Sequence, residues 1–193
     1  MTLKPLKHPF FVIIGPSGAG KTKVAEAVFP PAYKVISHTT RPIRKDEQEG
    51  KDYYFETKQL FGQLITSHSL AEYDLYHGHY YGVGISELYQ KTMDHYAYDV
   101  LTFKGFQAIE QLFGHLVIPI FLEVNKENVL SRLKTREDEP ETIKERLALY
   151  EQEARNLEKM KKYQCYFTID ANQAFELVVK EVEQVVAKVA KKE

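Results

Sequence analysis

A strand, a glycine-rich loop and a helix follow one another near the start of the chain, and this succession constrains the fold most. The run FVII at 11–14 is apolar and β-branched, which is typical of a buried strand. Three glycines follow within six positions, and then Lys21 and Thr22. Apolar residues recur at helical spacing after them, until the proline pair at 30–31 ends the helix. Further strand and helix patterns alternate along the chain, and this alternation predicts an α/β fold with a parallel sheet flanked by helices.

The loop itself matches G-x-x-x-x-G-K-[ST], the pattern of a phosphate-binding P-loop. In such a loop the backbone N–H groups converge on a phosphate, and the helix adds its positive N-terminal end. Lys21 is expected to reach the β- and γ-phosphates, and the Thr22 hydroxyl to ligate Mg²⁺. An ordinary glycine-rich turn is the alternative, but the flanking strand and helix favour phosphate binding. The candidate ATP-binding residues are Gly15, Ser17, Gly18, Ala19, Gly20, Lys21 and Thr22.

Composition narrows the class of protein further. The 193 residues are 44% hydrophobic and 27% charged, which is typical of a globular chain. With a net charge of -1 and no long basic block, the chain is not expected to bind nucleic acid. Cys165 is the only cysteine, so an intrachain disulfide is excluded. The apolar stretches at 9–14 and 116–124 are too short to span a bilayer, and residues 1–15 do not resemble a signal peptide. We therefore expect a cytoplasmic protein without a membrane partner.

The order of the predicted elements suggests one domain over residues 1–193. We expect strands at 97–103, 116–124 and 164–170, a strand beginning near 33, and antiparallel strands within 69–84. Helices are expected at 57–66, 85–96, 104–113, 126–134 and 142–162, and from 175 onward, where positions 175, 178, 179, 182, 185, 186 and 189 form one apolar face. This arrangement predicts a core over 9–36, 97–125 and 164–193, a small antiparallel acceptor-binding insert over 37–84 and a helical lid over 130–150.

The predicted insert contains a second group of charged and polar residues. Arg41 and Arg44 lie three positions apart, and Tyr53 follows. Two guanidinium groups and a phenol can hold a dianionic phosphate, although two arginines alone also suit a solvated loop. Glu72 lies on an apolar-flanked strand, where a carboxylate needs a partner.

Five segments in this order resemble guanylate kinase: GPSGAGKT, SHTTRPIR, EGKDYYF, LAEYDLYHGHYYG and RLKTR followed by IKER. The resemblance covers about residues 9 to 170. It implies a P-loop kinase that transfers phosphate from ATP, with Mg²⁺, to GMP or dGMP in purine nucleotide metabolism. Its partners would be small nucleotides, and it would act as a monomer or homodimer.

The resemblance also implies roles for individual residues. One carboxylate can accept hydrogen bonds from guanine N1–H and the 2-amino group together, so Glu72 would read the base. Arg132 and Arg136 lie on one helical face, and such lid arginines would neutralise charge on closure, although paired surface charges are the alternative. The GMP-binding residues would be Ser37, Arg41, Arg44, Tyr53, Glu72 and Tyr81, and the catalytic residues Lys21, Arg132, Arg136 and Arg146.

Several positions depart from the family pattern. Val83 stands where the family has a hydroxyl residue, and Val100, Thr102 and Lys104 replace the acids and the glutamine of D-x-D-x-Q-G. Asp99 is one residue out of register, so strand alternation predicts that it points to the opposite face. We therefore expect the acceptor site to lack both the hydroxyl and the strand carboxylates. YYGVG and DVL resemble instead the ribose 1,5-bisphosphate phosphokinases, so a kinase of another small phosphate, or a catalytically weak binding module, remains the alternative.

Overall fold

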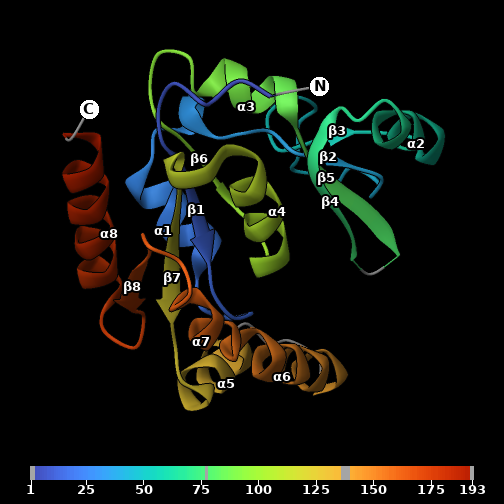
Figure 1. The fold of residues 1–193 in the computed structure, drawn as a ribbon. Coiled ribbons are helices and arrows are strands. Elements are labelled where there is room, and N and C mark those ends of the chain that lie inside the picture. The colour runs from blue at the N-terminus through green and yellow to red at the C-terminus, as the bar shows by residue number, and fades with distance from the viewer. Residues whose placement is uncertain (1–2, 77, 136–139, 192–193) are drawn as a thin grey trace.

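The computed structural model describes residues 3–76, 78–135 and 140–191, with the backbone alone described at 135 and 140–142. Two sheets organise the described chain, and Figure 1 shows the larger one at its centre. This sheet has the order β6-β1-β7-β8, and every neighbouring pair in it is parallel. Its strands are β1 (Phe10–Ile14), β6 (Ala97–Val100), β7 (Val117–Glu123) and β8 (Phe167–Asp170).

Strand β1 is buried on both faces because every one of its residues is apolar. Phe11 and Ile13 pack with α1 and α8 in one core cluster. Phe10, Val12 and Ile14 pack on the other face with α4. In Figure 1, α8 and α4 accordingly lie on opposite sides of the sheet. The helices are α1 (Lys21–Val28), α4 (Phe103–Phe113) and α8 (Phe175–Ala190).

The insert that was predicted to bind the acceptor forms a second, separate sheet of order β3-β2-β5-β4. The pairs β2–β5 and β4–β5 are antiparallel as expected, but β2 and β3 are parallel. Strand β4 also packs against α4, which joins the insert to the core. The elements are β2 (His38–Thr39), β3 (Tyr54–Phe55), α2 (Lys58–Thr66), β4 (Leu70–Tyr76) and β5 (His79–Gly84).

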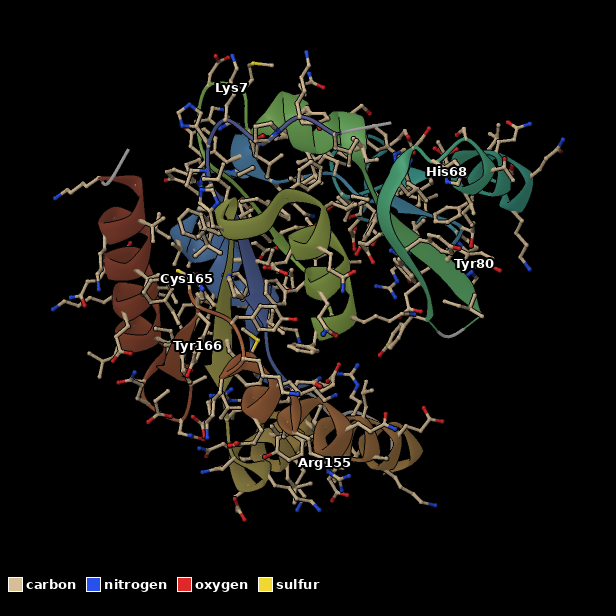
Figure 2. The ribbon with its side chains drawn as sticks, in the orientation of Figure 1. Lys7, His68, Tyr80, Arg155, Cys165 and Tyr166 are labelled. Carbon is tan, nitrogen blue, oxygen red and sulfur yellow. The ribbon has the colours of Figure 1, made fainter. Side chains whose placement is uncertain are left out.

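Three helices follow β7, and the predicted lid over 130–150 falls on the first two of them. The single helix expected over 142–162 is wrong, because it divides at Arg155 into two helices. Figure 2 labels Arg155 near this division and Tyr80 on the insert. The three helices are α5 (Lys126–Thr135), α6 (Pro140–Ala154) and α7 (Asn156–Met160).

Further expectations need correction, because the helix expected over 85–96 ends at Lys91 and the strand expected over 97–103 ends at Val100. The strand expected from residue 33 begins only at His38, because residues 34–37 contribute a single bridge, from Lys34 to Tyr98 of β6. The apolar face of α8 is buried at its centre, but Phe175 at its start is 44% exposed. The remaining elements are η1 (Pro31–Tyr33), α3 (Ile85–Lys91) and η2 (Gly114–Leu116). Every helix in the described part of the chain falls short of the length and apolar character needed to cross a bilayer.

Candidate active site

The glycine-rich loop between β1 and α1 has the backbone shape that its sequence predicts. Gly15 has φ of 149° and Gly18 has φ of 84°, and side chains rarely tolerate these values. A Cβ at Gly15 would lie 2.6 Å from the Leu122 carbonyl oxygen, and one at Gly18 would lie 2.8 Å from Val129. The loop is therefore held close to β7 and α5 by residues without side chains.

Lys21 is folded back onto this loop and faces a carboxylate from the lid. Its Nζ donates to the carbonyl oxygens of Gly15, at 2.7 Å, and Pro16, at 3.0 Å. The Ser17 backbone N–H donates to Oε2 of Glu153 at 2.6 Å. Burial lowers the pKa of Lys21, and the charge of Glu153 opposes this shift. A carboxylate of α6 thus occupies a position where a phosphate-binding loop presents its N–H groups to an anion.

Arg132 of α5 is bonded to the backbone of the same loop. Its guanidinium donates to the Gly18 and Ala19 carbonyl oxygens, both at 3.2 Å, and to the Ala171 carbonyl oxygen at 2.6 Å. These bonds tie α5 to the loop and to the end of β8. The structure therefore gives Arg132 a positioning contact, and its catalytic role stays a prediction.

A cavity of about 420 Å³ extends from the loop to the insert. Ser17, Lys21 and Glu153 line it on the side of the loop and lid. The insert and β6 supply the other walls. The predicted residues that line the cavity are Ser17, Lys21, Ser37, Arg41, Arg44, Tyr53, Glu72 and Tyr81.

The two predicted clamp arginines surround a carboxylate of their own loop. Arg41 makes a bidentate pair with Glu47, with contacts of 2.6 and 2.9 Å, and the Arg44 backbone N–H donates to the same carboxylate at 2.9 Å. The Arg41 guanidinium also lies over the Tyr53 ring, 5.5 Å from its centroid, and its neighbours Glu47 and Tyr81 raise its pKa. Glu47 therefore occupies an anion site built by the residues that were predicted to hold the acceptor phosphate.

Glu72 reaches the same cavity from β4 and is mostly shielded from water. Burial, followed by the charges of Asp99 and Asp74, raises the pKa of Glu72 to about 8. Lys104 opposes the shift from outside, where it pairs with Asp74 at 2.8 Å. The Glu72 carboxyl group is thus held in the cavity next to a second buried acid.

That second acid is Asp99, and the expectation that strand carboxylates are missing from the acceptor site is wrong. Strand alternation does place Asp99 on the face opposite Val100, but the insert and α4 cover that face. Asp99 lines the cavity, and Ser37 Oγ donates to its Oδ2 at 2.9 Å. The segment 34–37 runs beside β6, since Val35 N–H donates to Tyr98 O, and this contact brings Ser37 to Asp99.

The remaining predicted residues lie in different places. Thr22 is exposed in the first turn of α1. Burial raises the pKa of the cavity residue Tyr76, and the charge of Arg146 on α6 opposes this shift. Arg136 lies outside the described residues. Thr102 caps α4 by accepting the Gly105 N–H at 3.0 Å. Val83 is fully buried, so it offers an apolar surface where the family has a hydroxyl group.

Sequence reasoning missed Glu47, Glu153 and the cavity position of Asp99. Glu47 could have been found as an acid six residues after Arg41 in the same loop. Glu153 gave no local signal, because its partner Ser17 is 136 residues away. These acids became visible only once the fold brought distant segments together.

Comparison with known proteins agrees with this architecture. Residues 7–189 match the family model described as guanylate kinase. The guanylate kinase of Mycoplasma genitalium is 36% identical over 144 residues, which are 71% of this chain and 60% of that protein. The guanylate kinase of a Polaromonas species is 33% identical over 71% of this chain and 69% of its own length.

Solved structures show the same fold. A guanylate kinase from Anaplasma phagocytophilum superposes with a TM-score of 0.70 at 22% identity, over 97% of this chain and 89% of that one. A gluconokinase from Sinorhizobium meliloti superposes with a TM-score of 0.52 at 14% identity, over 98% of this chain and 97% of that one. The α/β fold is thus that of the P-loop kinases. With a family model that matches nearly its whole length, the chain belongs to the guanylate kinase family.

Proposed function

We propose that this protein transfers the γ-phosphoryl group of ATP to GMP or dGMP. The observation that carries the proposal is the continuous cavity between the phosphate-binding loop and the insert, with Lys21 at one end and the Arg41 anion site near the other. Glu72 adds a carboxyl group whose ionised form can accept hydrogen bonds from the N–H groups of guanine, and such bonds would favour its ionisation. Membership in the guanylate kinase family supports nucleoside monophosphate kinase chemistry, and the cavity supports this choice of acceptor.

In this mechanism a phosphate oxygen of GMP attacks the γ-phosphorus of ATP roughly in line with the leaving group. The new P–O bond forms as the bond to the β–γ bridging oxygen breaks, and ADP leaves with that oxygen. Lys21 turns from the Gly15 and Pro16 carbonyl oxygens toward the transferred group. Arg41, Arg44 and the phenol groups hold the acceptor phosphate, so that positioning and charge neutralisation supply the catalysis.

The magnesium ion that the family implies would arrive with ATP. In the described part of the chain, no group of three or more His, Cys, Asp or Glu residues could hold a metal ion. Mg²⁺ bound to a nucleotide needs few protein ligands, because phosphate oxygens and water complete its coordination. The exposed Thr22 hydroxyl, a hard oxygen ligand beside the loop, fits this need. The bound ion would neutralise charge on the phosphates of ATP.

The test is a coupled assay of ADP formation with Mg-ATP and each of GMP, dGMP, AMP, UMP and ribose 1,5-bisphosphate. GMP or dGMP should give the highest kcat/KM. Lys21→Ala should reduce turnover by at least about a hundredfold, the scale of losing one preorganised charge-stabilising donor. Lys23→Ala, an exposed lysine two residues along α1, is the matched control and should leave turnover unchanged.

Two results would overturn the proposal. Preference for ribose 1,5-bisphosphate over every nucleotide would assign the cavity to a sugar phosphate. Binding of ATP and GMP without ADP formation would instead favour a binding module. The far-UV circular dichroism of Lys21→Ala and of Lys23→Ala must match that of the parent protein for their turnover to be compared.

A further inference from the structure

Lys104 extends from the first turn of α4 toward the wall of the acceptor cavity, at a position where the family pattern described above has a glutamine. Its Nζ donates to Oδ1 of Asp74 at 2.8 Å, and Asp74 lines the cavity from β4. The exposed fractions of the two side chains are 70% for Lys104 and 37% for Asp74. The chain thus places an ion pair between α4 and β4, beside the residue proposed to hold guanine.

The same turn of α4 packs directly on the carboxyl group of Glu72. A Cβ at Gly105 would lie only 3.1 Å from Oε2 of Glu72, so the absence of a side chain at Gly105 leaves room for this carboxyl group. Thr102 caps the helix by accepting the Gly105 N–H at 3.0 Å. The N-terminal end of an 11-residue helix, which favours negative charge, therefore lies against Glu72 together with Lys104.

Two acids act on Glu72 from the strands around it. Asp74 lies two residues along β4, and Asp99 lies on β6. After burial, the charges of Asp99 and Asp74 are the causes that raise the pKa of Glu72 to about 8. The charge of Lys104 opposes this shift, and a hydrogen bond from the Val83 N–H of β5 adds to the opposition. Lys104 is affected in return, because its hydrogen bond with Asp74 raises its own pKa.

The other titratable groups around this wall act on Asp99 or on one another. Lys34, on the segment beside β6, lowers the pKa of Asp99, and Tyr53 also interacts with Asp99. Arg41 and Tyr81 lie beside Tyr53. In the described part of the chain, Lys104 is therefore the cation whose charge favours the ionised form of Glu72.

The charge state of Glu72 decides which edge of a base it can hold. As a carboxylate it accepts hydrogen bonds only, so it can serve guanine N1–H and the 2-amino group together. When protonated, it presents a donor to one of those two hydrogens. Pairing with Lys104 balances the charge of Asp74. The ion pair thus offsets one of the two negative charges that oppose ionisation of Glu72.

We propose that Lys104 is a positioning residue that, paired with Asp74, favours the ionised form of Glu72 and so sets the pH range in which GMP binds. This inference rests on the proposed function, since it requires guanine against Glu72. It gives a role to the lysine that replaces the glutamine of the family. When GMP binds, a protonated Glu72 releases its proton to the solvent. The KM for GMP should therefore fall as pH rises through the range in which Glu72 ionises.

The test measures the KM for GMP from about pH 6 to about pH 9 in the wild-type protein, Lys104→Gln, Asp74→Asn and the double variant. Lys104→Gln leaves the charge of Asp74 unbalanced, so the midpoint of the profile should rise by roughly half a unit. Asp74→Asn leaves Lys104 unbalanced, and the midpoint should fall by a similar amount. At pH 7 these shifts correspond to a KM about threefold higher and about threefold lower. The double variant should lie close to the wild type.

The opposite signs separate an effect of charge from an effect of structure. Both single substitutions break the same ion pair, so a purely structural contact between α4 and β4 would change the KM in the same direction in both. Ionisation of GMP itself is common to all variants, so the differences between their profiles carry the test. Because Lys104 is exposed, these differences should shrink in high salt. Lys58→Gln, an exposed lysine of α2, is the matched control and should leave the midpoint unchanged.

The outcomes distinguish the inference from the proposed function. If folded Lys104→Gln and Asp74→Asn shift the profile in the same direction, or leave it unchanged while GMP is phosphorylated, the inference alone is overturned. A wild-type protein that neither binds nor phosphorylates GMP overturns the proposed function, and the inference with it. Circular dichroism and a constant KM for ATP confirm the fold of each variant. Lys104→Met and Asp74→Ser make the same changes of charge if a first variant does not fold.

Discussion

At the scale of single residues, the position of the Glu72 carboxyl group in the cavity strongly disfavours its charged form. Its pKa of about 8 lies well above the ordinary value of 4.5, with burial as the main cause and Asp99 as the next. Between these two pH values the unfolded chain releases the proton that the folded chain keeps. The free energy of unfolding therefore falls as pH rises from about 4.5 to about 8. Glu72 thus lowers the stability of the free protein at neutral and alkaline pH.

Glu72→Gln should remove this loss of stability. The variant should match the wild-type protein at pH 4 and exceed its melting temperature by several degrees at pH 8.5. Thermal unfolding followed by circular dichroism at both pH values measures the difference. Glu183→Gln, on the exposed side of α8, is the control and should change neither melting temperature. If the difference in melting temperature between Glu72→Gln and the wild-type protein is the same at both pH values, the raised pKa does not belong to Glu72.

Single residues also show what the sequence could predict about the site. The P-loop residues were predicted from motif spacing, Arg41, Tyr53 and Glu72 from their chemistry and setting, and Tyr81 from the family resemblance alone. Asp99 was not, because alternation says which face a residue lies on but not what covers that face. The insert and α4 cover it and residues 34–37 run beside β6, and the insert and this segment are far from Asp99 in the sequence.

At the scale of elements, α6 connects the lid to the donor site. It carries Glu153, whose carboxylate accepts the Ser17 N–H at 2.6 Å. The phosphates of ATP need the same N–H group and the nearby Lys21. Binding of ATP must therefore displace the Glu153 carboxylate, and α6 must shift or that side chain must rotate.

Glu153→Gln should consequently tighten the binding of ADP and ATP by several-fold, because a neutral amide competes less well than a carboxylate for the loop. Isothermal titration calorimetry measures the change in Kd. Glu151→Gln is the matched control on the same helix, since Glu151 is exposed and pairs with Lys126 outside the site. Weaker nucleotide binding in Glu153→Gln alone would show that Glu153 assists the nucleotide rather than competing with it.

A substitution in the insert should change the binding of GMP and not that of ATP. Arg41→Ala should raise the KM for GMP by at least about tenfold, because it removes a bidentate anion partner and leaves Glu47 in the acceptor site. Initial-rate kinetics with both substrates varied give the two KM values. The KM for ATP should hold steady, and a rise in that value in place of the GMP value would place Arg41 on the donor side.

Element boundaries were predicted well where packing follows local pattern. Strand β1 and helix α1 agree with the sequence because apolar periodicity and Pro30-Pro31 define them. The break between α6 and α7 was missed, since neither proline nor glycine marks it. The parallel pairing of β2 with β3 depends on a connection of 14 residues between them and has no local signature.

At the scale of the whole molecule, the cavity joins walls from the parallel sheet, the insert and the lid. The class of fold was predictable, because strand and helix patterns alternate around the P-loop. The relative placement of insert and lid was not, because it depends on side-chain packing between segments far apart in the chain. A ligand that contacts both the P-loop and the insert should therefore test how these two parts of the protein are placed relative to each other.

Adenosine and guanosine joined by five phosphates would be such a ligand. It should bind at least about a hundredfold more tightly than ATP or GMP alone, because attachment makes the second binding step intramolecular. Calorimetry gives the affinities, and the corresponding diadenosine compound tests the contribution of the guanine end. Equal affinity for the two compounds would mean that the guanosine does not reach Glu72 in the cavity.

Glu47 and Glu153 give the free protein tethered counter-ions at the two anion sites of this cavity. When a mobile counter-ion leaves a site, its release into solution adds favourable entropy. A displaced carboxylate stays attached to the chain, so that entropy is not gained. An incoming anion therefore needs a higher charge to compete, and we expect a dianionic phosphate to displace these carboxylates more readily than chloride does.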